Sequence, residues 1–190
     1  MSDFTWNQLL RDQIEWHWQH QLRARLEGMS DEEYFWEPAP GSWNVRPRGT
    51  GTAPVQGGSG EMTIDFAFPE PVPAPMTTIA WRLGHVLVGV LAARNAAHFG
   101  GPAADYESFR YATTAEAALA QLDEHYGRWL VGVAALGEEE LRRPCGPTEG
   151  GFAGEPMATL VLLVHRELIH HLAEVALLRD LYAHTHREGN

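Results

Sequence analysis

The sequence predicts an all-α protein, a four-helix bundle with a long Gly/Pro-rich loop between the first and second long helices. Four segments carry apolar residues at the three- and four-residue spacing of helices that bury one or more faces. Alternation typical of strands is confined to one short stretch. With 190 residues and 44% hydrophobic content, the chain can bury a sizeable core, so we expect residues 1–190 to form a single bundle domain.

The first predicted helix covers residues 3–28. Leu10, Ile14 and His17 lie on one side of it, and Gly28 ends it. The next stretch, SDEEYFWEP, predicts a short helical turn, because a serine able to cap a helix is followed three residues later by a glutamate.

Residues 38–75 are dense in glycine and proline and predict a long irregular tract. Irregular segments of this length are uncommon unless they are functional or mobile, so the part from 46 to 75 is a candidate for the mouth of a site. Within it, EMTIDFAF alternates enough to predict a short strand or hairpin arm.

Three further helices are predicted, over residues 76–99, 113–136 and 156–184. The first of them is apolar nearly all round and should be central in the bundle. Thr77 or Thr78 is positioned to cap it, and Gly-Gly-Pro stops it at residues 100–102.

The charge balance excludes one class of partner. The chain has 14 basic and 25 acidic residues, a formal net charge of −11, and no basic run that would bind nucleic acid. Its longest apolar stretch is too short to span a bilayer, so no membrane partner is expected. Cys145 has no partner for an internal disulfide, and the N-terminal residues lack the apolar core of a signal peptide; we expect a cytoplasmic protein.

The last helix carries polar residues where apolar ones are expected. Successive helical residues advance by about 100°, so that Glu167 falls about 20° to one side of Leu160 and His171 about 20° to the other. The same face is otherwise apolar, with Val164, Leu168, Val175, Leu178 and Tyr182. His165 is predicted to point away from the core, and His170 and Glu174 lie at its margin.

Two interpretations of this pair are open. Glu167 and His171 could form a hydrogen bond at i,i+4, which would satisfy both groups in a core. Alternatively, they are two metal ligands that converge on one point, in which case a third must come from another helix. His85 is the natural candidate, because it interrupts an apolar helix and has Gly89 beside it on its own face. His17 is a possible neighbour of the same site.

Three stretches carry a resemblance to a known family: DEEYFWEPAPGSWNVRP, TIAWRLGHV and HRELIHHLAEVALLRDLY. In this order they resemble the DinB-like superfamily of four-helix-bundle proteins, and the first and third are similar to an actinobacterial branch of it. The superfamily includes thiol-dependent isomerases and transferases, among them mycothiol-dependent maleylpyruvate isomerase. The resemblance implies a divalent metal held by one histidine of the second long helix and two histidines, four apart, of the last.

His85 and His171 match two of these positions, but Glu167 stands where the family has histidine. Carboxylates also bind zinc, nickel, manganese and iron, so the resemblance implies the ligand set His85, Glu167 and His171, with a preference moved toward harder metals. His17, His170 and Glu174 are candidates to support the ligands from behind. A low-molecular-weight thiol such as mycothiol is the cosubstrate that the resemblance implies.

Three functions remain open for this sequence. The first is a metal-dependent enzyme, a thiol S-transferase acting on a small-molecule substrate in stress or detoxification. The second is a bundle that binds a metal or ligand without turnover. The third is a structural or homodimeric helical protein in which hydrogen bonds satisfy Glu167 and His171. A second apolar strip on the last helix, of the kind found at dimer interfaces or on helices buried on both sides, favours it: Leu162, Ile169 and Ala176.

Overall fold

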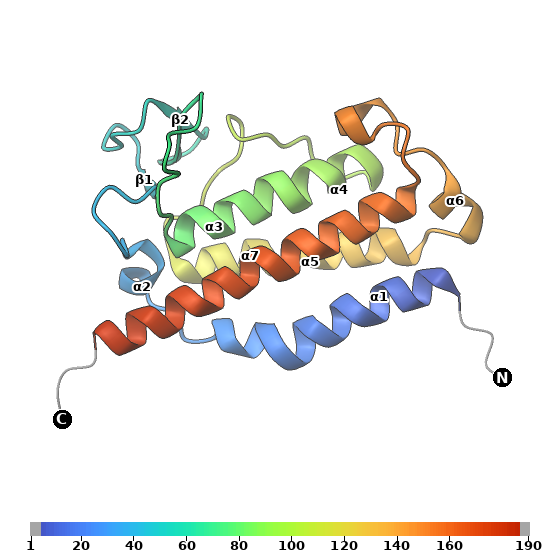
Figure 1. Ribbon diagram of the computed structural model, residues 1–190, viewed down its shortest axis with the longest axis horizontal. Coiled ribbons are helices and arrows are strands. Elements are labelled where there is room, and N and C mark those ends of the chain that lie inside the picture. Colours follow the sequence, from blue (N-terminus) through green and yellow to red (C-terminus); the bar gives the residue numbers. More distant parts are fainter. Residues whose placement is uncertain (1–4, 187–190) are drawn as a thin grey trace.

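Four long helical segments form the body of the protein in the computed structural model, which describes residues 5–186 (Figure 1). The first is α1 (Trp6–His17), which continues through a π-helical turn and a 3-10 turn to Leu26. The second is α3 (Ile79–His85), continued by a π-helical stretch and α4 (Ala93–His98). The third and fourth are α5 (Ala115–Ala134) and α7 (Met157–Thr185).

Each long helix packs against two others. Helix α1 contacts α5 and α7, and α3 contacts the same two helices from the other side. The colours of Figure 1 show that α1 and α7 run in one direction and α3 and α5 in the other, so residues 99–114 return along the bundle between α4 and α5. Among the residues described, no helix combines the length and the apolar character that crossing a membrane requires.

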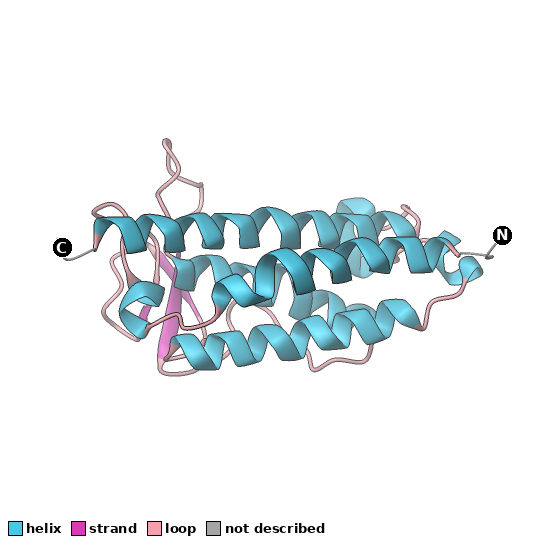
Figure 2. Ribbon diagram, turned by 90° about the horizontal axis from the view of Figure 1, so that it is seen from below, coloured by secondary structure: helices cyan, strands magenta, loops and turns pink. Residues whose placement is uncertain are grey.

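The prediction of a purely helical fold is wrong in one respect. Three short strands, β1 (Val45–Pro47), β2 (Val55–Gly57) and β3 (Met62–Phe66), form an antiparallel sheet in the order β1-β3-β2. The strand expected in EMTIDFAF is β3, the central one. Its partners were missed because three residues are too few for a periodic signal. Figure 2 shows the sheet at one end of the bundle, with its strands across the helix direction.

Local signals place the helix boundaries. Thr78 Oγ1 accepts a hydrogen bond from the Trp81 N–H at 3.1 Å, so Thr78, one of the two predicted threonines, caps α3. Thr114 caps α5 in the same way. Ser30 caps the short helix α2 (Asp31–Phe35), as its sequence predicts. The short helix α6 (Glu138–Arg142) lies between α5 and α7.

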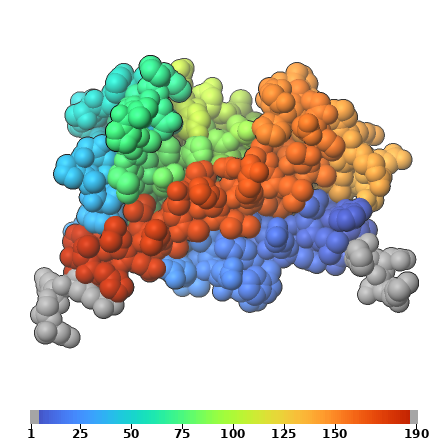
Figure 3. Space-filling model, viewed as in Figure 1, coloured from blue at the N-terminus to red at the C-terminus, as the bar shows by residue number. Residues whose placement is uncertain are grey.

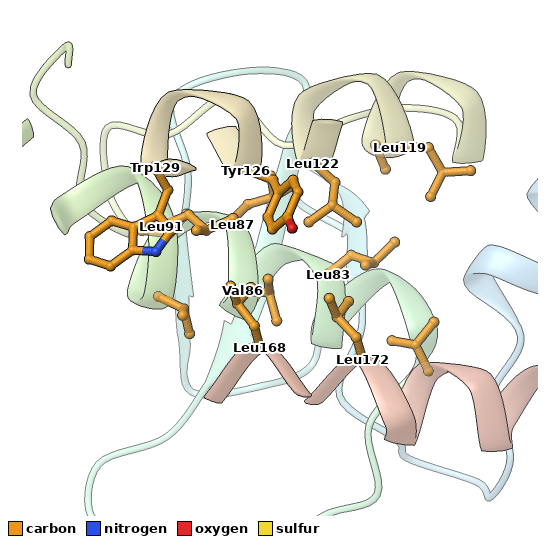
Figure 4. Close-up of a cluster of buried hydrophobic side chains, with 14 of the residues drawn as sticks. Leu83, Val86, Leu87, Leu91, Leu119, Leu122, Tyr126, Trp129, Leu168 and Leu172 are labelled. Atoms are coloured by element: carbon orange, nitrogen blue, oxygen red, sulfur yellow. The ribbon is translucent and has the colours of Figure 1, made fainter. Parts of the chain in front are cut away.

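The core lies between the four long helices (Figure 4). Leu83 and Val86 of the second segment lie opposite Leu172 and Leu168 of α7, and all four are buried. Figure 3 shows the segment that carries the sheet seated over one end of this helical body, on the side of α3. The bundle is therefore closely packed where α3 and α7 run side by side.

His165 corrects a second expectation, because it lies in the core and does not point away from it. Its Nε2 accepts a hydrogen bond from the indole N–H of Trp129 at 3.1 Å. Burial lowers the pKa of His165 to about 4. The helical wheel failed here because α7 is covered on more than one side: α1, α3 and α6 all pack against it.

Candidate metal centre

The start of α3 is anchored to the sheet, and this anchoring positions His85. The Trp81 indole N–H donates to the backbone carbonyl of Asp65 at 2.8 Å, and Thr78 Oγ1 donates to Asn44 Oδ1 at 2.7 Å. The His85 ring stacks on the Trp81 ring, with centroids 5.6 Å apart and planes at 8°. The imidazole is therefore held by Trp81. The indole of Trp81 is bonded to β3, and its backbone N–H is bonded to Thr78.

Helix α7 brings Glu167 and His171 to the same place. The His171 Nε2 lies 3.4 Å from Glu167 Oε2, as expected for side chains four apart on a helix. The ring of His171 meets the ring of His85 edge-on, with centroids 4.7 Å apart. The His171 side chain is 12% exposed and that of Glu167 is 32% exposed. The structure thus brings together the three residues that the sequence selects, at the margin of the core.

A second carboxylate fixes the orientation of His171. Its Nδ1 lies 2.9 Å from Glu174 Oε2, and the same oxygen is 3.0 Å from the Arg82 guanidinium. With the Nδ1 proton donated to Glu174, the lone pair of His171 is on Nε2 and faces the Glu167 carboxylate. Two acceptors that face one another at 3.4 Å call for a proton or a cation between them.

Tyr106 orients the ring of His85 in the way that Glu174 orients the ring of His171. Its hydroxyl lies 2.7 Å from His85 Nδ1, which leaves Nε2 without a hydrogen bond among the described residues. Two glycines make room for this tyrosine: a Cβ on Gly57 would lie 2.5 Å from its backbone oxygen, and a Cβ on Gly89 2.3 Å from its hydroxyl. The small residue that the sequence places beside His85 therefore does not leave empty space; Tyr106 occupies it.

The electrostatic surroundings favour a neutral His85. Burial, the neighbouring His171 and the Arg82 guanidinium lower the pKa of His85 to about 4, against the opposing effect of Glu167 and Glu174. Near neutral pH the imidazole is uncharged, and in the tautomer whose Nδ1–H donates to the Tyr106 hydroxyl the Nε2 lone pair is free to bind a metal ion.

Among the described residues, one trio meets the distance requirement for metal binding as it stands, and it is a different one. The candidate ligand atoms of His170, His171 and Glu174 all lie within 4.8 Å of one another. The His170 side chain, however, is 64% exposed, and its Nε2 is 3.8 Å from Glu174. We therefore favour the trio of His85, Glu167 and His171.

The donor types of the favoured trio suit a divalent ion. Two imidazoles with Nδ1 engaged and Nε2 available, plus one carboxylate, form a set that binds zinc, iron, nickel or manganese and leaves positions open. The guanidinium of Arg166, an exposed side chain, lies 3.2 Å from Glu167 Oε1 while Oε2 faces His171. The hydrogen bonds at Nδ1 are the contacts that orient the two imidazoles.

Other expected supporting residues are placed differently. His17 hydrogen-bonds Gln21 of the same helical segment at 2.8 Å, and it makes no hydrogen bond or ring contact with His85 or His171. Arg82 and Tyr106 were missed from the sequence. Arg82 is three residues before His85 on the same helix, a signal that was present; Tyr106 lies in the segment after α4, where no periodicity marks it.

Cavities adjoin His85 on two sides. One of about 350 Å³ is walled by β2, β3 and Tyr106, so residues of the Gly/Pro-rich tract do form part of its wall. The other, about 230 Å³, lies between His85, Arg94 and Glu167. A small molecule in either cavity can reach the region of the candidate ligands.

Comparison with known proteins gives one match. A family model described as the DinB superfamily matches residues 51–175, more than half of the chain, and the matched part includes His85, Glu167, His171 and Glu174. No curated protein and no solved structure matches the chain.

Proposed function

The chain belongs to the DinB superfamily, and from this premise we propose that His85, Glu167 and His171 bind one divalent metal ion in a small-molecule enzyme site. The observation that carries the proposal is the paired orientation of the two histidines. Each is engaged at Nδ1, by Tyr106 or by Glu174, and keeps Nε2 for a ligand bond. A purely structural Glu–His pair would not need His85 at the same point.

The proposed reaction is transfer of a low-molecular-weight thiol to a small electrophile. A bound divalent ion would lower the pKa of a coordinated thiol or water and so supply a nucleophile at neutral pH. The chain's own residues orient the site: Glu174 and Tyr106 hold the imidazoles, Arg166 contacts Glu167, and the cavities beside His85 receive the organic reactant. We expect this activity in the cytoplasm.

A second candidate is a non-catalytic bundle that dimerises, and one observation favours it. The outer strip of α7 remains partly uncovered, with Leu162 51% exposed, and α1 presents Trp6 and Trp16 to solvent. Such patches are typical of association surfaces. Sedimentation of the purified chain over a range of concentrations tests this candidate, and it leaves the metal proposal untouched.

The metal proposal is tested by metal content after reconstitution with zinc, nickel, manganese or iron. We expect about one ion per chain in the wild type and loss of that ion in His85→Ala, His171→Ala and Glu167→Ala. His170→Ala and His184→Ala are matched controls on the same helix and should retain it. Loss in His170→Ala with retention in His85→Ala would overturn the proposed ligand set in favour of the exposed trio.

The transferase proposal needs its own measurement. Thiol consumption with electrophilic test substrates should require both the metal and an intact His171. A metal-loaded protein that accelerates no thiol transfer would contradict the proposed reaction and leave a metal-binding bundle.

A further inference from the structure

The cavity between the sheet and α3 has a chemical character that the proposed metal centre does not explain. Its volume is about 350 Å³, within the range of small-molecule sites, and eleven residues line it. Five of the eleven are phenylalanine, tryptophan or tyrosine, and one of these, Phe68, is 83% exposed. The four less exposed rings come from four separate parts of the chain: Trp43, Phe66, Trp81 and Tyr106. His85 closes the side that faces the metal centre.

The four aromatic rings are oriented in more than one direction around the cavity. The Phe66 ring lies at 62° to the ring of Trp81, 63° to that of Trp43 and 83° to that of Tyr106, with centroid separations of 4.9 to 6.2 Å. Rings set at steep angles present both faces and edges to a shared space. A face of a π-system carries partial negative charge, and several such faces form a cage for a cation.

The charged residues of the wall have one sign. Glu70 and Glu107 line the cavity, and none of the eleven lining residues, all within the described part of the chain, is a lysine or arginine. The whole chain adds a formal charge of −11. An anionic ligand would meet no cationic side chain among these eleven residues, whereas an organic cation would meet aromatic rings and two carboxylates.

We propose that this cavity binds the quaternary or tertiary ammonium group of a small organic molecule. The inference rests on the proposed function only in that the rest of the molecule would extend past His85 to the metal centre. It goes further in naming the substrate class: an organic cation held at its ammonium group by Trp43, Phe66, Trp81 and Tyr106. Recognition by the cavity itself needs none of the proposed metal ligands except His85, which forms part of the wall.

The test uses three probes of nearly equal shape and different charge. Choline is positive, 3,3-dimethylbutan-1-ol is its neutral isostere, and 3,3-dimethylbutanoate is negative. Titrated calorimetrically into the full-length protein, choline should bind about tenfold more tightly than the alcohol, and the carboxylate should not bind. Equal affinity for choline and the alcohol would overturn the inference, because the cavity would then recognise shape and apolarity alone.

Variants separate the two sources of charge recognition. Phe66→Leu keeps an apolar wall but removes a ring, so it should weaken choline binding several-fold and leave the neutral alcohol nearly unchanged. Glu70→Gln and Glu107→Gln should weaken choline alone, by a smaller factor, because both side chains are exposed and screened. Trp16→Leu and Glu139→Gln are matched controls away from the cavity. Thermal denaturation of each variant excludes a folding defect, and the exposed glutamates test the inference even if Phe66→Leu does not fold.

The same titrations separate this inference from the metal proposal. They are repeated on the His171→Ala variant and on wild type with and without added metal. Choline binding should persist without metal and weaken somewhat when a divalent ion is present, because like charges repel. Choline binding with no metal uptake would overturn the proposed function only. Metal uptake without selective choline binding would overturn the present inference only.

Discussion

His171 Nδ1 lies 2.9 Å from Glu174 Oε2, one turn further along α7, and the same carboxylate oxygen is 3.0 Å from the Arg82 guanidinium of α3. This relationship links the two helices that carry the candidate ligands. It also decides which nitrogen of His171 is available, because the nitrogen that faces Glu174 is occupied.

Glu174→Gln should lower metal affinity about 10- to 100-fold without abolishing binding, because the amide holds the His171 ring less firmly and no longer adds negative charge. Competition with a chromophoric chelator measures this affinity. Glu116→Gln, an exposed glutamate on α5, is the control. Unchanged affinity in Glu174→Gln would show that Glu174 does not support the ligand.

Gly89→Ala should disturb the packing of the Tyr106 side chain against the helix. The new methyl group would lie 2.3 Å from the tyrosine hydroxyl and 3.3 Å from His85 Cε1, so the ring must move and its hydrogen bond to His85 breaks. We expect a loss of about 1–3 kcal/mol in the free energy of unfolding.

Gly127→Ala is the matched control for this substitution, because a Cβ at that helical glycine meets nothing within 4 Å. It should stabilise the protein by about 0.5–1 kcal/mol. Urea denaturation of both variants gives the comparison. A Gly89→Ala variant as stable as Gly127→Ala would contradict the close packing of Tyr106 against Gly89.

Arg46→Met should be costly, because Arg46 lies 3.0 Å from Asp65, a carboxylate that is 2% exposed. Removing the guanidinium leaves a buried charge with only the Asn44 N–H as a donor, and we expect a loss of about 3–5 kcal/mol. Arg142→Met, in a surface pair with Glu138, should change stability by less than about 1 kcal/mol. Chemical denaturation of the two variants checks the contrast.

His165→Leu should destabilise the core by about 1–3 kcal/mol, because the buried Trp129 N–H loses its acceptor. His165→Gln retains an acceptor and should recover part of the loss. Equal stability of the two variants, measured by thermal and urea unfolding, would mean that the hydrogen bond to Trp129 contributes little.

Much of the helical architecture follows from local chemistry. The spacing of apolar residues predicts the four long segments, and the caps at Ser30 and Thr78 begin two helices as expected. The pairing of Glu167 with His171 is equally local, since residues four apart on one helix must lie close together. His85 could be predicted as a site residue because a polar, titratable side chain in an apolar helix is costly to bury without a partner.

The helices, their caps and the i,i+4 spacing of the two candidate ligands on α7 could be predicted, because each depends on interactions within a few residues. How the remaining parts of the site meet depends on packing between distant segments. The three-residue strands exist because β3 pairs with both, His165 is buried because α7 is covered on several sides, and Tyr106 reaches His85 across 21 positions of sequence. Such contacts join residues far apart in the chain, and no local periodicity encodes them.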